Sequence, residues 1–126
     1  MKSLGKHLIV ELYDCNRDLI ARVDKVEQIL VDAVKLSKAT IVAPVFHQFN
    51  PHGVSGVVVI AESHFSIHTW PEYGYCALDI FTCGELIDSD AALHFMKEAF
   101  QAKSMSVMEL KRGTLDIPEG ELRHKP

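Results

Sequence analysis

The middle of the chain carries three β-type runs joined by connections too short to hold a helix. Val54 to Ala61 is continuously apolar, Phe65 to Trp70 alternates polar and apolar residues, and Tyr75 to Thr82 is again strand-like. Pro71 to Gly74 has the composition of a turn between the last two runs. Strands that follow one another this closely form hairpins, so the stretch predicts the centre of an antiparallel-rich sheet.

Three further strands are expected outside this stretch. Gly5 to Leu12 predicts the first strand of the chain, and Ser104 to Leu110 predicts the last. Thr40 to Phe49 predicts a strand in which Pro44 requires an edge position or a bulge, because proline cannot donate to a sheet ladder. The charged tail from Lys111 to Pro126 is expected to be loosely held.

Two amphipathic helices are predicted by apolar residues at steps of three and four. The first begins near Arg17, behind the N-cap candidates Asp14 to Asn16, and its apolar stripe holds Leu19, Val23, Val26, Leu30 and Ala33. The second is capped by Asp88 or Ser89 and continues to about Ala102. Its core side comprises Ala92, Phe95, Met96, Ala99 and Phe100. Each helix should therefore lie on a flat apolar surface.

The predicted element order is β-α-β-β-β-β-α-β, and 126 residues suit one domain, residues 1–126. Two helices with one-sided stripes and a hairpin-connected sheet indicate an α+β fold, a two-layer sandwich with both helices on one sheet face. The other face would stay partly apolar. A second subunit is the simplest cover for it.

Composition and charge exclude several classes of protein. The formal net charge is −4 and no basic stripe occurs, so we expect no nucleic-acid partner. The N-terminus lacks a signal peptide's apolar core, and no apolar run approaches the ~18 residues that cross a bilayer. Three cysteines without CxxC spacing indicate neither disulfides nor a cysteine-rich zinc site. We expect a soluble protein of the reducing cytoplasm that does not associate with a membrane.

Two histidine pairs are candidate metal ligands. His64 and His68 have a spacing that chelates zinc on a helix, but the residues between them favour a strand. Four residues of strand span roughly 13 Å, which is too far for one metal ion. His47 and His52 are separated by a proline-containing turn and offer no better geometry. We therefore predict no metal site.

Ser63 lies where one predicted strand ends and the next begins, between Glu62 and His64. A serine at such a place is ordinarily a turn residue. In an unbroken strand Ser63 and His68 would point to opposite faces, because their separation is odd. They meet only if the backbone turns or bulges between Glu62 and Phe65, and His68 could then take the proton of the Ser63 hydroxyl.

Cys83 ends a predicted strand just before Gly84, a position that suits an exposed sulfur. Cys76, within the same strand, is the better candidate for a core thiol. Other side chains allow ordinary interpretations, as surface carboxylates (Glu72, Asp79) or as core (Trp70, Phe49). The residue types alone thus indicate an enzyme site without identifying its reaction.

Three motifs carry a resemblance to a known family: Glu62-Ser63-His64, His68-Thr69-Trp70-Pro71-Glu72 and Phe81-Thr82-Cys83-Gly84. Together they closely resemble the small prokaryotic S-adenosylmethionine decarboxylases, which are pyruvoyl enzymes of polyamine and spermidine biosynthesis. The segments GKHLIVELYDC and PHGVSGVVVIAESH are similar to the same family. The resemblance extends over nearly the whole chain apart from its C-terminal tail.

The resemblance implies that the chain is a proenzyme that cleaves itself before Ser63. The Ser63 hydroxyl would attack the Glu62 carbonyl, and the resulting ester would break by β-elimination into residues 1–62 and 63–126. Hydrolysis of the remaining dehydroalanine would leave a pyruvoyl group at position 63. His68 would accept a proton during processing, with Ser55 as a supporting contact.

The resemblance also implies the substrate chemistry and the oligomeric state. The pyruvoyl group would form a Schiff base with S-adenosylmethionine and act as the electron sink for CO₂ loss, and Cys83 would donate the proton that replaces CO₂. Phe49, Trp70 and Glu72 would lie near the substrate, where aromatic rings suit adenine and the sulfonium charge, and a carboxylate suits ribose hydroxyls. Members of the family are homodimers, or heterotetramers of two α and two β chains after cleavage.

Three alternatives remain at this point. A pyruvoyl decarboxylase of arginine or ornithine would keep the same processing machinery and differ only in its pocket. An inert dimeric module would not react at Ser63. A hydrolase built on Cys83 and a histidine would show thiol-dependent activity without chain cleavage.

Overall fold

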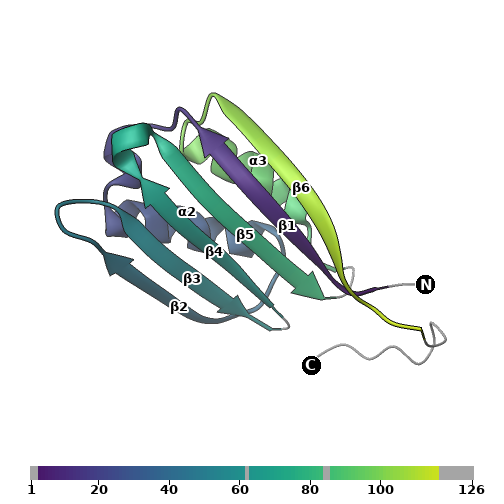
Figure 1. Ribbon diagram of the computed structural model, residues 1–126. Coiled ribbons are helices and arrows are strands. Elements are labelled where there is room, and N and C mark those ends of the chain that lie inside the picture. Colours follow the sequence, from purple (N-terminus) through teal and green to yellow (C-terminus); the bar gives the residue numbers. More distant parts are fainter. Residues whose placement is uncertain (1–2, 62, 84–85, 117–126) are drawn as a thin grey trace.

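The computed structural model describes residues 3–61, 63–83 and 86–116, which form a six-stranded antiparallel sheet with helices packed behind it (Figure 1). The strand order is β2-β3-β4-β5-β1-β6. The elements are β1 (Ser3–Tyr13), α1 (Arg17–Ile20), α2 (Val23–Leu36), β2 (Ile41–Gln48), β3 (Val54–Ile60), β4 (Ser63–Trp70), η1 (Pro71–Tyr73), β5 (Tyr75–Cys83), α3 (Ser89–Ala99) and β6 (Ser104–Thr114). The predicted two-layer α+β sandwich is confirmed.

The three central strands pair in sequence order, as their short connections predict. Ser55 lies opposite His68 in the β3–β4 pair, and Ile67 lies opposite Leu78 in the β4–β5 pair. The tight connection after β4 is the 3₁₀ turn η1, which Gly74 closes in the left-handed conformation (φ 62°) that favours glycine.

The two edges of the sheet are formed by β2 and β6. β2 is the outer strand beside β3, so the prediction that Pro44 marks an edge is confirmed, and the register shifts nearby between Ile41 and Ala43. β6 forms the other edge and continues to Thr114 along β1. The prediction of a loose tail is therefore wrong for residues 111–114, and residues 117–126 lie outside the described residues.

The predicted first helix is divided into two. Asn16 caps α1 by accepting hydrogen bonds from the amides of Asp18 and Leu19. The helix then stops, because Arg22 is extended (φ −117°, ψ 124°) and α2 starts afresh at Val23. Predicting one continuous helix from residue 17 was wrong, although the apolar stripe of α2 is buried as expected.

The second helix, α3, is capped by the carboxylate of Asp88, which accepts from the amide of Ala91 at 3.0 Å. It ends at Ala99, three residues earlier than predicted, because Gln101 adopts a left-handed conformation (φ 57°). The shorter helix still presents its apolar side to the sheet. Within the described residues, no helix is long and apolar enough to cross a membrane.

The core lies between the helices and one face of the sheet. Alternate residues of the central strands point into it, and its largest fully buried side chains include Phe65, Ile67, Leu78, Ile80, Ile20, Leu30, Met96 and Phe100. On the opposite face the described part of the chain places no helix (Figure 1). That open face combines polar side chains with exposed or half-buried apolar ones such as Val59.

Candidate active site

The predicted site residues divide between the two ends of the sheet. β4 and β5 run in opposite directions, so the start of β4 at Ser63 and the end of β5 at Cys83 share one end (Figure 1). Ser55 and His68 lie near the other end, close to η1. Glu62, the predicted partner of Ser63 in cleavage, lies outside the described residues.

Ser63 and Cys83 are in contact at their end of the sheet. The Ser63 hydroxyl donates to the Cys83 sulfur at 3.6 Å. Cys83 is only 7% exposed, so the prediction of an exposed sulfur was wrong. The reason is that β5 includes Cys83, which pairs with Gly5 of β1 instead of starting a loop. Cys76 is fully buried, which confirms it as a core thiol.

Ser55 and His68 form the second polar pair. They lie directly opposite one another on β3 and β4, and the Ser55 oxygen is 2.8 Å from Nδ1 of His68. A histidine held through one ring nitrogen keeps its orientation and leaves the other nitrogen available for proton transfer. The placement suits a base that is supported by Ser55.

Ser63 and His68 do not meet within one chain. β4 pairs regularly with β3 from Ser63 onward, with Ser63 opposite Ile60 and His64 opposite Val59. Five residues of regular strand span roughly 16 Å and reverse the side-chain direction. The backbone irregularity that would bring the two side chains together is not present from Ser63 to Phe65.

Aromatic rings gather on the open face at the Ser55 end. Trp70 is 40% exposed and Phe49 is 48% exposed, so the alternative that they belong to the core is wrong. Trp70 stacks on Tyr75 with 5.3 Å between ring centroids, and the His68 ring, also on β4, lies tilted 6.3 Å from that of Trp70. His47 contacts Phe49 edge to face. These rings form an open apolar surface suited to a flat ligand.

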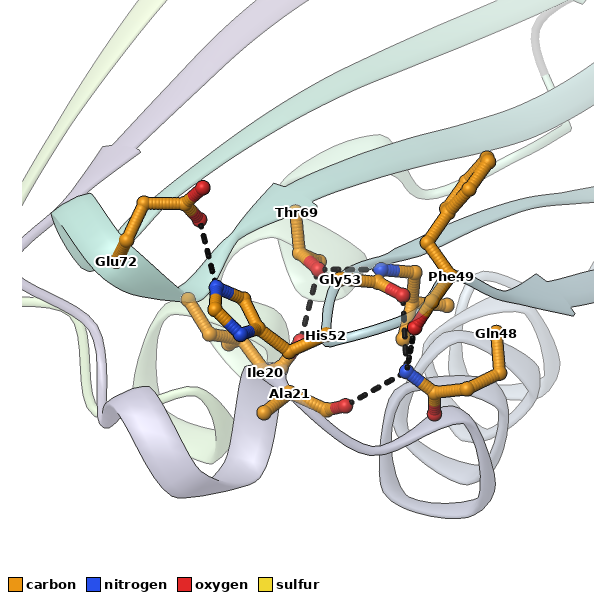
Figure 2. A network of polar contacts seen from close by, with 9 residues as sticks. Ile20, Ala21, Gln48, Phe49, His52, Gly53, Thr69 and Glu72 are labelled. Atoms are coloured by element: carbon orange, nitrogen blue, oxygen red, sulfur yellow. Dashed lines mark hydrogen bonds and ion pairs between the residues drawn. The ribbon is translucent and has the colours of Figure 1, made fainter.

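Two carboxylates border this aromatic surface. Glu72, in η1, lies 3.5 Å from Nε2 of His52, as Figure 2 shows. Glu11, on β1, accepts a hydrogen bond from the Tyr75 hydroxyl, whose oxygen is 2.6 and 2.7 Å from the two carboxylate oxygens. Burial and the neighbouring Glu11 charge raise the pKa of Tyr75 above its ordinary value, so the phenol keeps its proton.

The sequence interpretation missed His52, Glu11 and Tyr75 as neighbours of the site. The contact of His52 depends on how the 49–53 loop folds back toward η1, and the Tyr75 contact depends on β1 lying beside β5. No local sequence pattern predicts either contact, because each joins segments that are distant in the sequence.

His64 and His68 both lie on β4, which confirms the strand on which the argument against a shared metal ion depended. His64 stacks on Phe81, and burial lowers its pKa below the ordinary value. The Asp79 charge opposes this shift, whereas His7 adds to it. Among the described residues, no three His, Cys, Asp or Glu side chains converge as a metal site would require.

Comparison with known proteins decides the family. S-adenosylmethionine decarboxylase is the family that matches residues 6–113. The chain belongs to the S-adenosylmethionine decarboxylase family. It is 51% identical over 125 residues to the S-adenosylmethionine decarboxylase proenzyme of Thermodesulfovibrio yellowstonii, covering 99% of this chain and 93% of the relative. It is 53% identical over 122 residues to the proenzyme of Thermotoga maritima, covering 94% of each.

A solved structure agrees with this family. The crystal structure of the adenosylmethionine decarboxylase from Aquifex aeolicus VF5 superposes with a TM-score of 0.86 at 34% sequence identity. The match covers 94% of this chain and 98% of that one. The α+β sandwich of the S-adenosylmethionine decarboxylase family is therefore also the fold of this member.

Proposed function

We propose that this chain is a pyruvoyl-dependent S-adenosylmethionine decarboxylase made as a self-cleaving proenzyme. The observation that carries the proposal is the Ser63–Cys83 contact, in a chain whose relatives are named decarboxylase proenzymes. The serine that would become the reactive group lies beside a thiol that can supply a proton. The family disfavours the inert module and the thiol hydrolase.

In the processing step, the Ser63 oxygen attacks the Glu62 carbonyl carbon, and the acyl group passes from nitrogen to oxygen. Loss of the Ser63 α-proton then expels Glu62 as a carboxylate and leaves dehydroalanine. This elimination separates residues 1–62 from residues 63–126. Water then replaces the nitrogen of the dehydroalanine, and ammonia departs. A general base is needed for these proton transfers, and His68 with Ser55 is the candidate.

The pyruvoyl group supplies an electrophilic carbonyl that draws electrons from the substrate as CO₂ leaves, which no ordinary side chain can do. The surrounding residues fit such a group at position 63. Cys83 is buried, so its thiol is shielded from bulk water, and its sulfur is 3.6 Å from the Ser63 oxygen. We assign Cys83 as the donor that protonates the product carbon.

The separation of Ser63 from His68 supports a homodimer, or a heterotetramer of two α and two β chains once cleavage has occurred. A base on one chain is roughly 16 Å from the serine of that chain and reaches a serine only on a second copy. The open sheet face provides a surface for such pairing. Two-fold symmetry would then build two equivalent sites, each with Ser63 and Cys83 from one chain and Ser55 and His68 from the partner.

Substrate binding is assigned to the exposed aromatic surface. Phe49 and Trp70 offer ring faces for adenine and for the sulfonium charge. Glu72 offers carboxylate oxygens to the ribose hydroxyls. All three side chains are exposed near the same end of the sheet as His68, which in a dimer would bring them to the partner's Ser63.

A substrate comparison tests this function. We expect CO₂ release from S-adenosylmethionine far above release from arginine or ornithine, because the pocket determines the substrate. A preference for either basic amino acid would replace the proposal by the alternative decarboxylase. We place the reaction in the cytoplasm, since all three cysteines are buried and unpaired, as suits a reducing compartment.

A further inference from the structure

Gln48, the last residue of β2, makes a dense set of side-chain hydrogen bonds with backbone groups. Its amide nitrogen donates to the carbonyl oxygens of Ala21 (3.0 Å), Gly53 (2.9 Å) and Phe49 (3.3 Å). Its oxygen accepts from the amide of Val23 at 2.8 Å. The nitrogen carries two protons, so the longest contact shares one of them. Figure 2 shows the nitrogen at the centre of this network.

These bonds fasten a loop of the proposed substrate site to the helical layer. Ala21 and Val23 border the break between α1 and α2, whereas Phe49 and Gly53 are the two ends of the loop 49–53. The loop also closes on itself, with the Phe49 amide donating to the Gly53 carbonyl at 2.8 Å. Gly53 has φ 109°, a conformation that only glycine adopts without strain.

Thr69 secures the point where this loop enters β3. Its hydroxyl accepts from the Val54 amide at 2.9 Å and donates to the Ile20 carbonyl at 2.7 Å. Thr69 is buried and lies between His68 and Trp70 on β4. The loop is therefore anchored to β4 as well as to the helices (Figure 2).

Two side chains of the anchored loop lie at the aromatic surface proposed to bind the substrate. Phe49 lies at its start, and His52 lies near its end with Nε2 3.5 Å from one oxygen of Glu72. The side chains of His52 and Glu72 are 40% and 45% exposed, so their ion pair adds little to stability. Its consequence is geometric: one carboxylate oxygen faces His52, and the other is left to face a ligand.

We propose that His52 orients the Glu72 carboxylate and that Gln48 positions the loop that carries His52 and Phe49. Both are positioning residues for the nucleoside part of the substrate, and neither touches the reacting atoms. This inference rests on the proposed function, because it takes Phe49 and Glu72 as substrate contacts. Its expected signature is weaker substrate binding with little change in the chemical step.

The first test compares His52→Ala with His52→Gln in the processed enzyme. We expect His52→Ala to raise KM about tenfold while kcat stays within about twofold, since the Glu72 carboxylate loses the ring that orients it. His52→Gln keeps an N–H donor and should recover most of the loss. In a Glu72→Ala background, His52→Ala should have no further effect, because it acts through that carboxylate. His94→Ala, an exposed histidine on α3, is the matched control.

The second test uses Gln48→Glu, which keeps the accepting oxygen and removes both N–H donors. We expect KM to rise about tenfold or more, whereas the same change at Gln28, an exposed residue whose side chain bonds Asp32 one helical turn away, should not alter KM. Unchanged KM in His52→Ala, or an equal effect without Glu72, would overturn the role of His52. A lowered Tm with unchanged KM would reduce Gln48 to a structural residue. Failure of the wild type to cleave or release CO₂ would instead refute the proposed function.

Discussion

The hydroxyl of Ser63 lies 3.6 Å from the sulfur of Cys83, across the β4–β5 pair at one end of the sheet. This contact joins the residue proposed to become the pyruvoyl group to the residue proposed to protonate the product. Because Cys83 is almost fully buried, bulk water would not compete with its thiol as the proton source.

Replacing Cys83 should separate processing from catalysis. In Cys83→Ala we expect normal cleavage before Ser63 but a decarboxylation rate lower by about 10²–10⁴-fold, the usual contribution of a positioned acid. Cleavage is followed by mass spectrometry and catalysis by CO₂ release. Cys15→Ala, a buried thiol that follows β1 toward the opposite end of the sheet, should behave like the wild type in both assays. Equal loss of both activities in Cys83→Ala would contradict the assignment.

Mixed dimers should reveal whether one site draws on two chains. We expect Ser63→Ala and His68→Ala chains to remain uncleaved when each is made alone. When the two are co-expressed, a hybrid dimer contains one site with an intact Ser63 and the partner's intact His68. Cleavage of the His68→Ala chain alone, in up to about half of its copies for random pairing, is therefore expected. Its complete absence in verified hybrids would place each site within one chain.

The half-buried imidazole of His64 should make stability depend on pH. Burial lowers its pKa below the ordinary value of 6.5, so the unfolded chain binds the proton more readily than the folded one. The stabilisation is present above about pH 6.5 and is lost as the pH falls below it. We expect Tm to fall less between pH 7.5 and pH 5.5 in His64→Phe, which keeps the ring against Phe81, than in the wild type. An equal or larger fall in the variant would contradict this role.

The Phe46 ring on the neighbouring strand occupies the space that a side chain at position 56 would need, so only glycine fits there. A Cβ added at Gly56 would lie 2.0 Å from a Phe46 ring carbon, so the ring would have to move. We expect Gly56→Ala to reduce the free energy of unfolding by about 1–3 kcal/mol. In a Phe46→Ala background the same change should have much less effect. Urea denaturation of the four proteins measures the coupling, and additive effects would disprove it.

Most of the fold could be predicted from local patterns, because β3, β4 and β5 follow each other through short turns. The break between α1 and α2 could not, since it is stabilised by the Gln48 side chain, which bonds Ala21 and Val23 from far along the sequence. The extension of β6 over residues 111–114 was missed for another reason: an exposed edge strand needs no apolar alternation.

The sequence predicted which residues form the candidate site, but it did not predict how they are arranged in space. Strand parity correctly separated Ser63 from His68, and the described residues from Ser63 to Phe65 contain no bulge that would reunite them. The burial of Cys83 depends on pairing with Gly5, a contact between opposite ends of the sequence that no local pattern contains. The roles of these residues remain predictions.

Mass spectrometry of the purified protein after incubation at neutral pH tests the central claim most directly. We expect two chains, residues 1–62 and residues 63–126, with the second lighter by one molecule of ammonia than a chain beginning with serine and resistant to Edman degradation. Ser63→Ala should remain a single chain under the same conditions. A wild-type protein that stays intact, or that is cut with a free serine at position 63, would contradict the account.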